Sequence, residues 1–164
     1  MGTVDLRKAL SLIQKYCAYQ ERSQQEVRDK LYSYGLHRNQ VEPLIAELIV
    51  SGFLKEERFA IAFAGGKFRM KAWGKLKIAH ALKLKKIPEK IINIALSQID
   101  EQDYVKTLKK LINERSEVFN DRIPLNKSHS PERIRAIKAG KIAQYFIRRG
   151  FEPELVWSYL AGDE

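Results

Sequence analysis

The feature that most constrains the fold is a pattern of apolar residues that recurs three times in one register. Each copy has a stretch with apolar residues every three or four positions, a turn, and a second such stretch, which is typical of paired helices. A fixed register across the turn, with every matched position apolar, indicates tandem repeats. The first copy holds Val27, Leu31, Leu36, Val41, Leu44 and Ile45; a shift of 51 gives Ile78, Leu82, Ile87, Ile92, Ala95 and Leu96; a further shift of 64 gives Ile142, Phe146, Phe151, Val156, Tyr159 and Leu160.

The same spacing continues through most of the chain, and no stretch alternates in the way a strand does, so nine helices are predicted. Ser23 and Glu26 form a capping-box pattern at the start of the second helix. Gly35, Lys86 and Gly150 occupy the aligned positions at which the first helix of each pair should end. The helices are expected at about 5–19, from 23 to the turn at 35, 39–52, 55–71, 74–85, 88–98, 100–118, from 130 to the turn at 150, and 153–160.

The predicted fold is all-α, with three tandem three-helix repeats at 1–54, 55–99 and 100–164. The third repeat carries a polar insertion near 119–130, with Pro124 inside it, which explains the larger second shift. A unit of three short helices buries its own apolar faces poorly. Neighbouring repeats are therefore expected to stack into an elongated, curved array.

Positive charge is concentrated in the middle of the chain. The net charge is +10, but residues 1–60 hold nine Lys or Arg against eight Asp or Glu, whereas residues 67–90 hold nine against Glu89 alone. A region this basic attracts phosphate groups or an acidic protein surface. No apolar stretch is long enough to span a membrane and no signal-peptide pattern is present, so a cytosolic protein without a membrane partner is expected. Cys17, the single cysteine, is expected to be a buried structural thiol.

Two groups of basic residues are the candidate binding sites. Each could also be an ordinary solvated helix face, but the first group has more charge than solubility requires and lacks acids to pair with. Trp73 could stack on a base or on a partner, although a tryptophan at a helix junction more often packs internally. The first group is Lys67, Arg69, Lys71, Trp73, Lys75, Lys77, Lys83, Lys85 and Lys86; the second, on one face of the eighth helix, is Lys138, Lys141, Arg148 and Arg149.

No catalytic or metal-binding constellation is found, so neither an enzyme nor a bound cofactor is expected. His37, His80 and His129 are far apart and lack Cys or carboxylate partners at ligand spacing. Glu56 and Glu57 are best explained as the first turn of a helix, where carboxylates meet the positive end of its dipole. The sequence around Gly65 and Gly66 does not match a phosphate-binding loop, and close helix packing or a kink explains these glycines better.

Three ordered motifs resemble the RecX family of bacterial recombination regulators, and the resemblance covers nearly the whole chain. Two features depart from the family pattern: Lys86 stands where a glycine is common, and Gly65 with Gly66 interrupts a helix that usually has none. The motifs are Gly52, Phe53, Leu54, Glu56, Glu57, Arg58, Phe59 and Ala60 at the first junction; Lys67, Arg69, Lys71, Trp73, Gly74, Lys77, Ile78 and Leu82 in the second repeat; and Arg149, Gly150 and Phe151 at the third turn.

The resemblance implies a regulator in homologous recombination, DNA repair and the SOS response. It implies a monomeric helical array that binds the RecA recombinase filament on single-stranded DNA and inhibits its ATPase and strand exchange. Whether the basic residues would contact RecA or DNA stays open. The alternatives are a basic helical-repeat protein that binds DNA directly without acting on RecA and, from another class, a helical enzyme, which would require converging ionisable side chains in a pocket.

Overall fold

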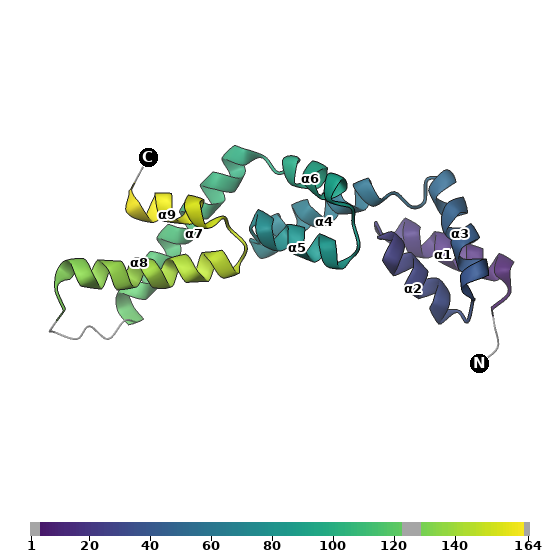
Figure 1. The fold of residues 1–164 in the computed structure, drawn as a ribbon, viewed down its shortest axis with the longest axis horizontal. Coiled ribbons are helices and arrows are strands. Elements are labelled where there is room, and N and C mark those ends of the chain that lie inside the picture. The colour runs from purple at the N-terminus through teal and green to yellow at the C-terminus, as the bar shows by residue number, and fades with distance from the viewer. Residues whose placement is uncertain (1–3, 123–128, 163–164) are drawn as a thin grey trace. The chain divides into compact units, whose positions relative to one another are not determined.

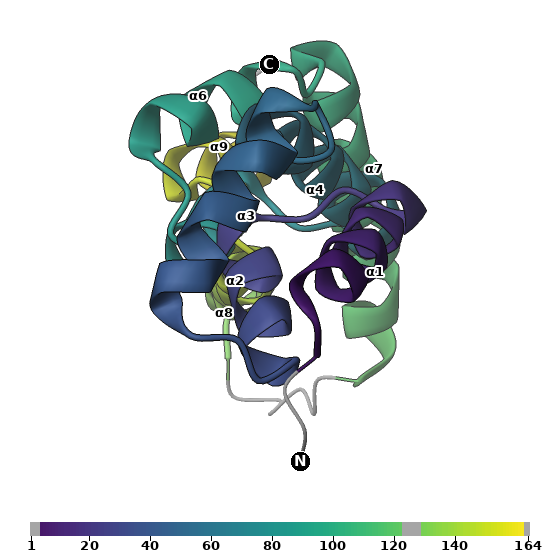
Figure 2. The same cartoon turned by 90° about the vertical axis from the view of Figure 1, so that its right-hand side faces the viewer.

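The computed structural model describes residues 4–122 and 129–162. Within these ranges all regular elements are α-helices, which confirms the all-α prediction, and Figure 1 and Figure 2 show them from two directions. None of the described helices is long and apolar enough to cross a membrane. The helices are α1 (Leu6–Tyr19), α2 (Gln24–Ser33), α3 (Arg38–Val50), α4 (Glu56–Lys71), α5 (Lys75–Leu84), α6 (Glu89–Ser97), α7 (Glu101–Arg122), α8 (Pro131–Arg148) and α9 (Pro153–Ala161).

The seventh helix is longer than predicted. It was expected to end near Val118, with a polar insertion following, but α7 continues to Arg122. The added residues are polar and contain neither glycine nor proline, so nothing in them breaks a helix. The rest of the insertion before His129, including Pro124, lies outside the described residues.

Helix starts follow the expected capping chemistry. The Ser23 backbone amide donates to Glu26 Oε2 at 2.9 Å, and the Glu26 amide donates to Ser23 Oγ at 3.1 Å, which confirms the capping box. Ser130 Oγ accepts from the Arg133 amide at 3.3 Å at the start of α8. These bonds satisfy amide donors that have no partner inside the helix.

The three aligned turn positions share one backbone conformation. Gly35, Lys86 and Gly150 have φ angles of 81°, 61° and 91°, all in the left-handed region. The Lys86 amide donates to the carbonyl three residues back at 2.9 Å, and the next amide donates to the carbonyl five residues back at 3.1 Å. The same pair of bonds at Gly150 measures 3.0 and 3.1 Å. This is the Schellman helix ending, and its recurrence at aligned positions supports the register of the repeats.

The chain divides by its contacts into two compact units, each described by itself. Unit 1 comprises Met1–Gly65 and Ala81–Gln98, and unit 2 comprises Gly66–His80 and Ile99–Glu164. The boundaries of the three predicted repeats stay a prediction.

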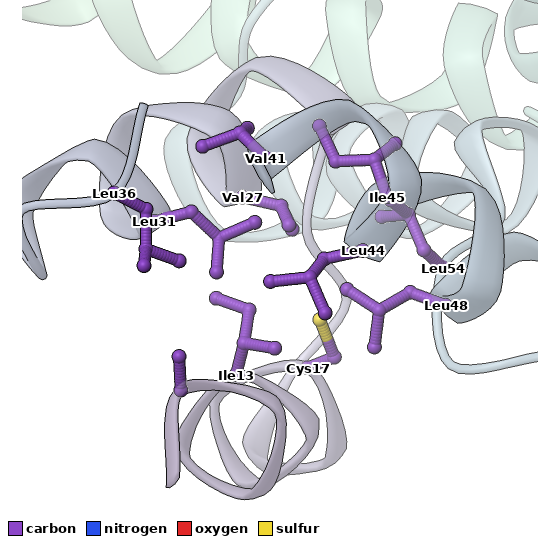
Figure 3. Packing of buried hydrophobic residues seen from close by; sticks show 11 residues of the cluster. Ile13, Cys17, Val27, Leu31, Leu36, Val41, Leu44, Ile45, Leu48 and Leu54 are labelled. Carbon is purple, nitrogen blue, oxygen red and sulfur yellow. The ribbon is translucent and has the colours of Figure 1, made fainter. Parts of the chain in front are cut away.

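The core of unit 1 contains apolar side chains from α1, α2 and α3, which pack against one another (Figure 3). Cys17 is buried in this core, as predicted, and burial raises the pKa of its thiol. Three ion pairs between described residues lie within unit 1: Arg28 with Glu42 at 2.8 Å, Arg58 with Glu21 at 2.6 Å, and Lys85 with Glu26 at 3.1 Å.

The core of unit 2 is built around a chain of aromatic rings. Tyr104 in α7 is fully buried, and its ring centroid lies 5.5 Å from that of Phe68 and 5.3 Å from that of Phe151. Phe146 in α8 continues the chain at 6.0 Å from Phe151. Such tilted and edge-to-face pairs stabilise a core beyond the area they bury. They fix α8, which packs against α7 and α9.

Candidate functional site

Two glycines allow the start of α5 to meet the end of α8 within unit 2. The Gly74 amide donates to the Arg149 carbonyl at 2.8 Å, and the Leu76 amide donates to the Gly150 carbonyl at 2.9 Å. A Cβ atom on Gly74 would lie 2.1 Å from the Gly150 carbonyl carbon, and one on Gly150 would lie 2.3 Å from the Lys77 Cβ. Only glycine fits at either position. The contact brings together two basic segments that lie far apart in the sequence.

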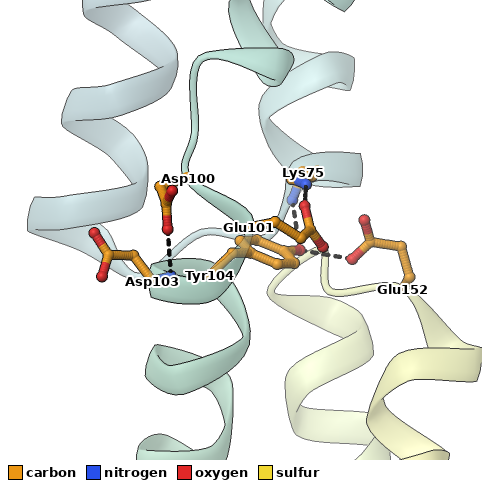
Figure 4. Close-up of polar contacts among 6 residues, drawn as sticks. All are labelled: Lys75, Asp100, Glu101, Asp103, Tyr104 and Glu152. Carbon is orange, nitrogen blue, oxygen red and sulfur yellow. Dashed lines mark hydrogen bonds and ion pairs between the residues drawn. The ribbon is translucent and has the colours of Figure 1, made fainter.

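Tyr104 holds this junction from the side of α7 (Figure 4). Its hydroxyl accepts from the Lys75 backbone amide at 3.1 Å and donates to Glu152 Oε2 at 2.6 Å. Burial, together with the bond to Glu152, raises the pKa of Tyr104, so the hydroxyl keeps its proton and remains a donor. The Lys75 ammonium forms an ion pair with Glu101. Lys75 is therefore engaged inside unit 2 through both its backbone and its side chain.

Arg149 supports the same junction with its side chain. Its Nε donates to the Ala72 carbonyl at 3.4 Å, and its guanidinium also bonds to the Lys71 carbonyl. A third bond, of 3.3 Å, runs from Nη1 to the Tyr145 hydroxyl. A guanidinium at these carbonyls is favourable because the C-terminal end of a helix, here α4, carries partial negative charge.

A groove of about 410 Å³ lies beside the junction. Four of its lining residues are basic, two are aromatic, and none of the described residues that line it is acidic. Lys141 and Arg148 are exposed, and no ion pair between described residues involves either of them. The arrangement is suited to an anionic ligand that also has an apolar face. We call this site the basic groove; its lining residues are Lys77, Phe119, Lys141, Gln144, Tyr145, Arg148 and Arg149.

Arg115 orders the aromatic side of the basic groove from α7. Its guanidinium carbon lies 4.1 Å from the Tyr145 ring centroid and 5.1 Å from the Phe119 ring centroid. Cation–π contacts of this kind hold a ring in place while adding positive charge behind it. Arg115 itself lines a smaller adjacent cavity of about 220 Å³, which shares Tyr145 and Arg149 with the basic groove.

The structure brings together four of the predicted binding residues and places the others elsewhere. Lys77, Lys141, Arg148 and Arg149 line the basic groove. Lys138 lines a separate groove with Arg135 and Leu160, whereas Lys75 is engaged with Glu101. Arg69 and Lys71 are exposed on α4, and Lys83, Lys85 and Lys86 belong to unit 1, where Lys85 forms an ion pair with Glu26.

Trp73 contacts Lys77, which lines the basic groove. Its half-buried ring has the Lys67 and Lys77 ammonium nitrogens at 5.0 and 4.5 Å from the ring centroid. The ring is therefore in contact with two of the predicted binding residues.

Sequence reasoning missed the aromatic half of the groove. Phe119 was placed in the polar insertion, although it lies in α7. Tyr145 precedes Arg148 and Arg149 by three and four residues, so the helical spacing of an aromatic residue and two arginines was a usable signal.

The residues rejected as catalytic or metal-binding show ordinary surroundings. Glu56 and Glu57 occupy the first turn of α4, as predicted. His37 and His80 are exposed, and His37 lies at the N-terminal cap of α3. Among the described residues, no group of three His, Cys, Asp or Glu side chains could hold a metal ion.

The chain matches a family model and several named proteins. Residues 56–96 match the model of the second three-helix domain of RecX. The chain is 27% identical to the regulatory protein RecX of Prosthecochloris aestuarii over 95% of this chain and 93% of that one. It is 29% identical to that of Thermotoga petrophila, over 92% and 81%. A longer relative, RecX of Lactobacillus johnsonii, is 30% identical, and the match covers 63% of this chain but 38% of that protein.

Solved structures agree with these matches. The crystal structure of RecX from Lactobacillus salivarius superposes with a TM-score of 0.80 at 21% identity, covering 96% of this chain and 95% of the other. A second RecX crystal structure gives a TM-score of 0.78 at 21% identity, covering 97% and 72%. The chain shares the fold of these helical proteins. Its match to the second three-helix domain of RecX, and its similarity to RecX regulatory proteins over nearly its whole length, support membership of the RecX family.

Proposed function

We propose that this protein regulates the RecA recombinase by binding its filament on single-stranded DNA and lowering its ATPase and strand-exchange activities. The proposal rests on membership of the RecX family. One observation supports the basic groove as the binding surface: four of its lining residues are cationic, and none of the described lining residues is acidic. A filament of protein on DNA presents phosphates and acidic protein surface, and both attract such a site.

Binding would restrain RecA by shifting the equilibrium between states of the filament. A ligand that prefers one state of the filament shifts the population toward that state by its difference in affinity for the two states. A protein that holds an inactive filament state, or the end of a filament, therefore lowers the DNA-dependent ATPase without a catalytic group of its own.

A second function is supported by the same groove. A cationic site with aromatic residues could bind DNA directly, without any action on RecA. The two functions differ in whether RecA turnover on DNA responds to the protein.

The test is to titrate the protein into RecA with single-stranded DNA and ATP at a low and a moderate salt concentration while measuring ATP hydrolysis. We expect inhibition that weakens with salt, because the groove acts through charge. The variant Lys141→Glu/Arg148→Glu should weaken inhibition about tenfold or more. Lys106→Glu, which reverses an exposed charge on α7 outside the groove lining, serves as a control and should inhibit like the unaltered protein.

ATPase activity that is untouched at every concentration, combined with binding to free DNA, would contradict the proposal and favour the direct DNA-binding function. Inhibition that is equal for all the variants would show that the regulator acts through another surface.

A further inference from the structure

We infer that the basic groove is a site for single-stranded nucleic acid, holding phosphates on its cations and stacking an unpaired base on Phe119. The inference deepens the function proposed above, on which its biological meaning rests, by naming the ligand class of the groove. It rests on the nature and position of the lining residues in unit 2.

The cationic side of the groove comes from two elements. Lys77 projects from α5, and Lys141 and Arg148 project from α8, where they lie seven residues, or two helical turns, apart. Two turns rise about 10 Å, a span over which an extended strand can place successive phosphates. The glycine junction at Gly74 and Gly150 sets the position of Lys77 relative to α8.

The aromatic side comes from α7 and α8. Phe119 and Tyr145 line the same groove as the cations, and Arg115 lies against both rings. Tyr145 is further tied to Arg149 through its hydroxyl, so it is fixed in the wall of the groove. Phe119 is partly exposed, and its ring can stack on a base of any type because stacking needs no matching hydrogen-bonding groups.

This combination distinguishes among anionic ligands. In a duplex the base faces are covered by neighbouring base pairs, so a duplex could use the cations but not Phe119. An acidic peptide would likewise use the cations and gain little from an aromatic face. A single strand exposes phosphates and base faces together, which is the pairing of groups found in the groove. Gln144, which also lines the groove, adds donors and an acceptor for a base edge.

The experiment measures binding of the full chain to a fluorescent single-stranded oligonucleotide and to the matching duplex, without RecA. We expect the single strand to bind more tightly. Phe119→Leu keeps an apolar side chain but removes the ring, and should weaken single-strand binding about tenfold while leaving duplex binding unchanged. Tyr19→Leu, which removes an exposed ring in unit 1, is the matched control and should change neither.

The charges are tested separately through the salt dependence. Lys141→Glu should weaken binding of both ligands and reduce the slope of log affinity against log salt for the single strand by about 0.7 or more. Lys106→Glu is the control for the change of charge. A polyglutamate peptide is the competing probe: if it binds with the affinity of the single strand and loses it in Lys141→Glu, while Phe119→Leu changes nothing, the inference is overturned.

The same preparations assayed with RecA separate this inference from the proposed function. Inhibition of RecA by a protein that shows no preference for single strands, or whose preference survives Phe119→Leu, would overturn the groove inference and leave the regulator. A single-strand preference lost in Phe119→Leu, in a protein that leaves RecA turnover unchanged, would support the groove inference and overturn the regulator.

Discussion

Lys86 adopts a backbone conformation that strongly favours glycine. Its φ of 61° lies in the left-handed region, where the Cβ of an L-residue crowds the backbone. The aligned positions, Gly35 and Gly150, carry the residue that this conformation favours. Lys86 is exposed, and none of the hydrogen bonds or ion pairs between described residues involves its side chain. The helix ending therefore retains a strain that the other two turns avoid.

We predict that Lys86→Gly stabilises the protein by about 1 kcal/mol, because it removes this strain. Urea unfolding followed by circular dichroism measures the change. Lys86→Ala separates the causes, since it removes the charge and the long side chain but keeps Cβ. It should leave stability nearly unchanged, and an equal gain from alanine would show that the charge of Lys86, and not its backbone, was unfavourable.

Gly66 in α4 and Gly74 at the groove junction differ in whether there is space for a side chain. The sequence predicts close packing or a kink around Gly65 and Gly66. At Gly66 the structure does not support close packing, because a Cβ there would meet nothing within 4 Å. The helix α4 continues through this position without interruption. Gly74, by contrast, lies against the Gly150 backbone.

We predict that Gly66→Ala stabilises the protein by about 1 kcal/mol, since alanine is the better helix former and has space. Gly74→Ala should destabilise it by at least about 2 kcal/mol through overpacking against backbone atoms. Both changes add one methyl group, so each is the control for the other in urea unfolding. Equal effects of the two substitutions would contradict this account of the junction.

Across the whole molecule, several carboxylates depend on ionisation for their contribution to stability. Burial acts to raise the pKa of Glu26, but bonds from the Ser23 amide and Lys85 outweigh it and leave the pKa below its ordinary value. The hydrogen bond from Arg28 lowers the pKa of Glu42. Burial raises the pKa of Glu56, which has the opposite effect.

The direction in which stability changes with pH follows from the difference in pKa between the folded and the unfolded state. A carboxylate with a lowered pKa in the folded state contributes fully above its unfolded value, about 4.5, and loses that contribution as pH falls through the folded value. We predict that the free energy of unfolding falls between about pH 5 and pH 3, as protonation also increases the net positive charge of +10. Glu132, whose pKa is lowered by hydrogen bonds from its own backbone amide and from Ser130, acts in the same direction, so Glu56 opposes the fall only in part.

Urea unfolding across this pH range measures the effect. The variant Glu26→Gln/Glu42→Gln should be less stable at neutral pH and should lose less stability on acidification. Glu47→Gln removes an exposed carboxylate that takes part in no ion pair between described residues, so it should follow the unaltered protein. A double variant with the full acid sensitivity would contradict the assignment.

The sequence by itself determined the helices, their order, the capping box at Ser23 and the turns at Gly35, Lys86 and Gly150. These features depend on neighbours within a few residues, so a local pattern is enough to specify them. The end of α7 was missed because its added residues are polar but compatible with a helix.

Only the tertiary structure decided which basic residues act together. Lys77 and Lys141 are 64 positions apart in the sequence, yet they line one groove because Gly74 and Gly150 let two backbones touch. Lys75 has the same charge as Lys77 but forms an ion pair with Glu101. Composition counts both lysines as positive and cannot tell them apart. Helical spacing shows which residues share a face of one helix, but packing between distant segments determines which charges form ion pairs and which remain exposed.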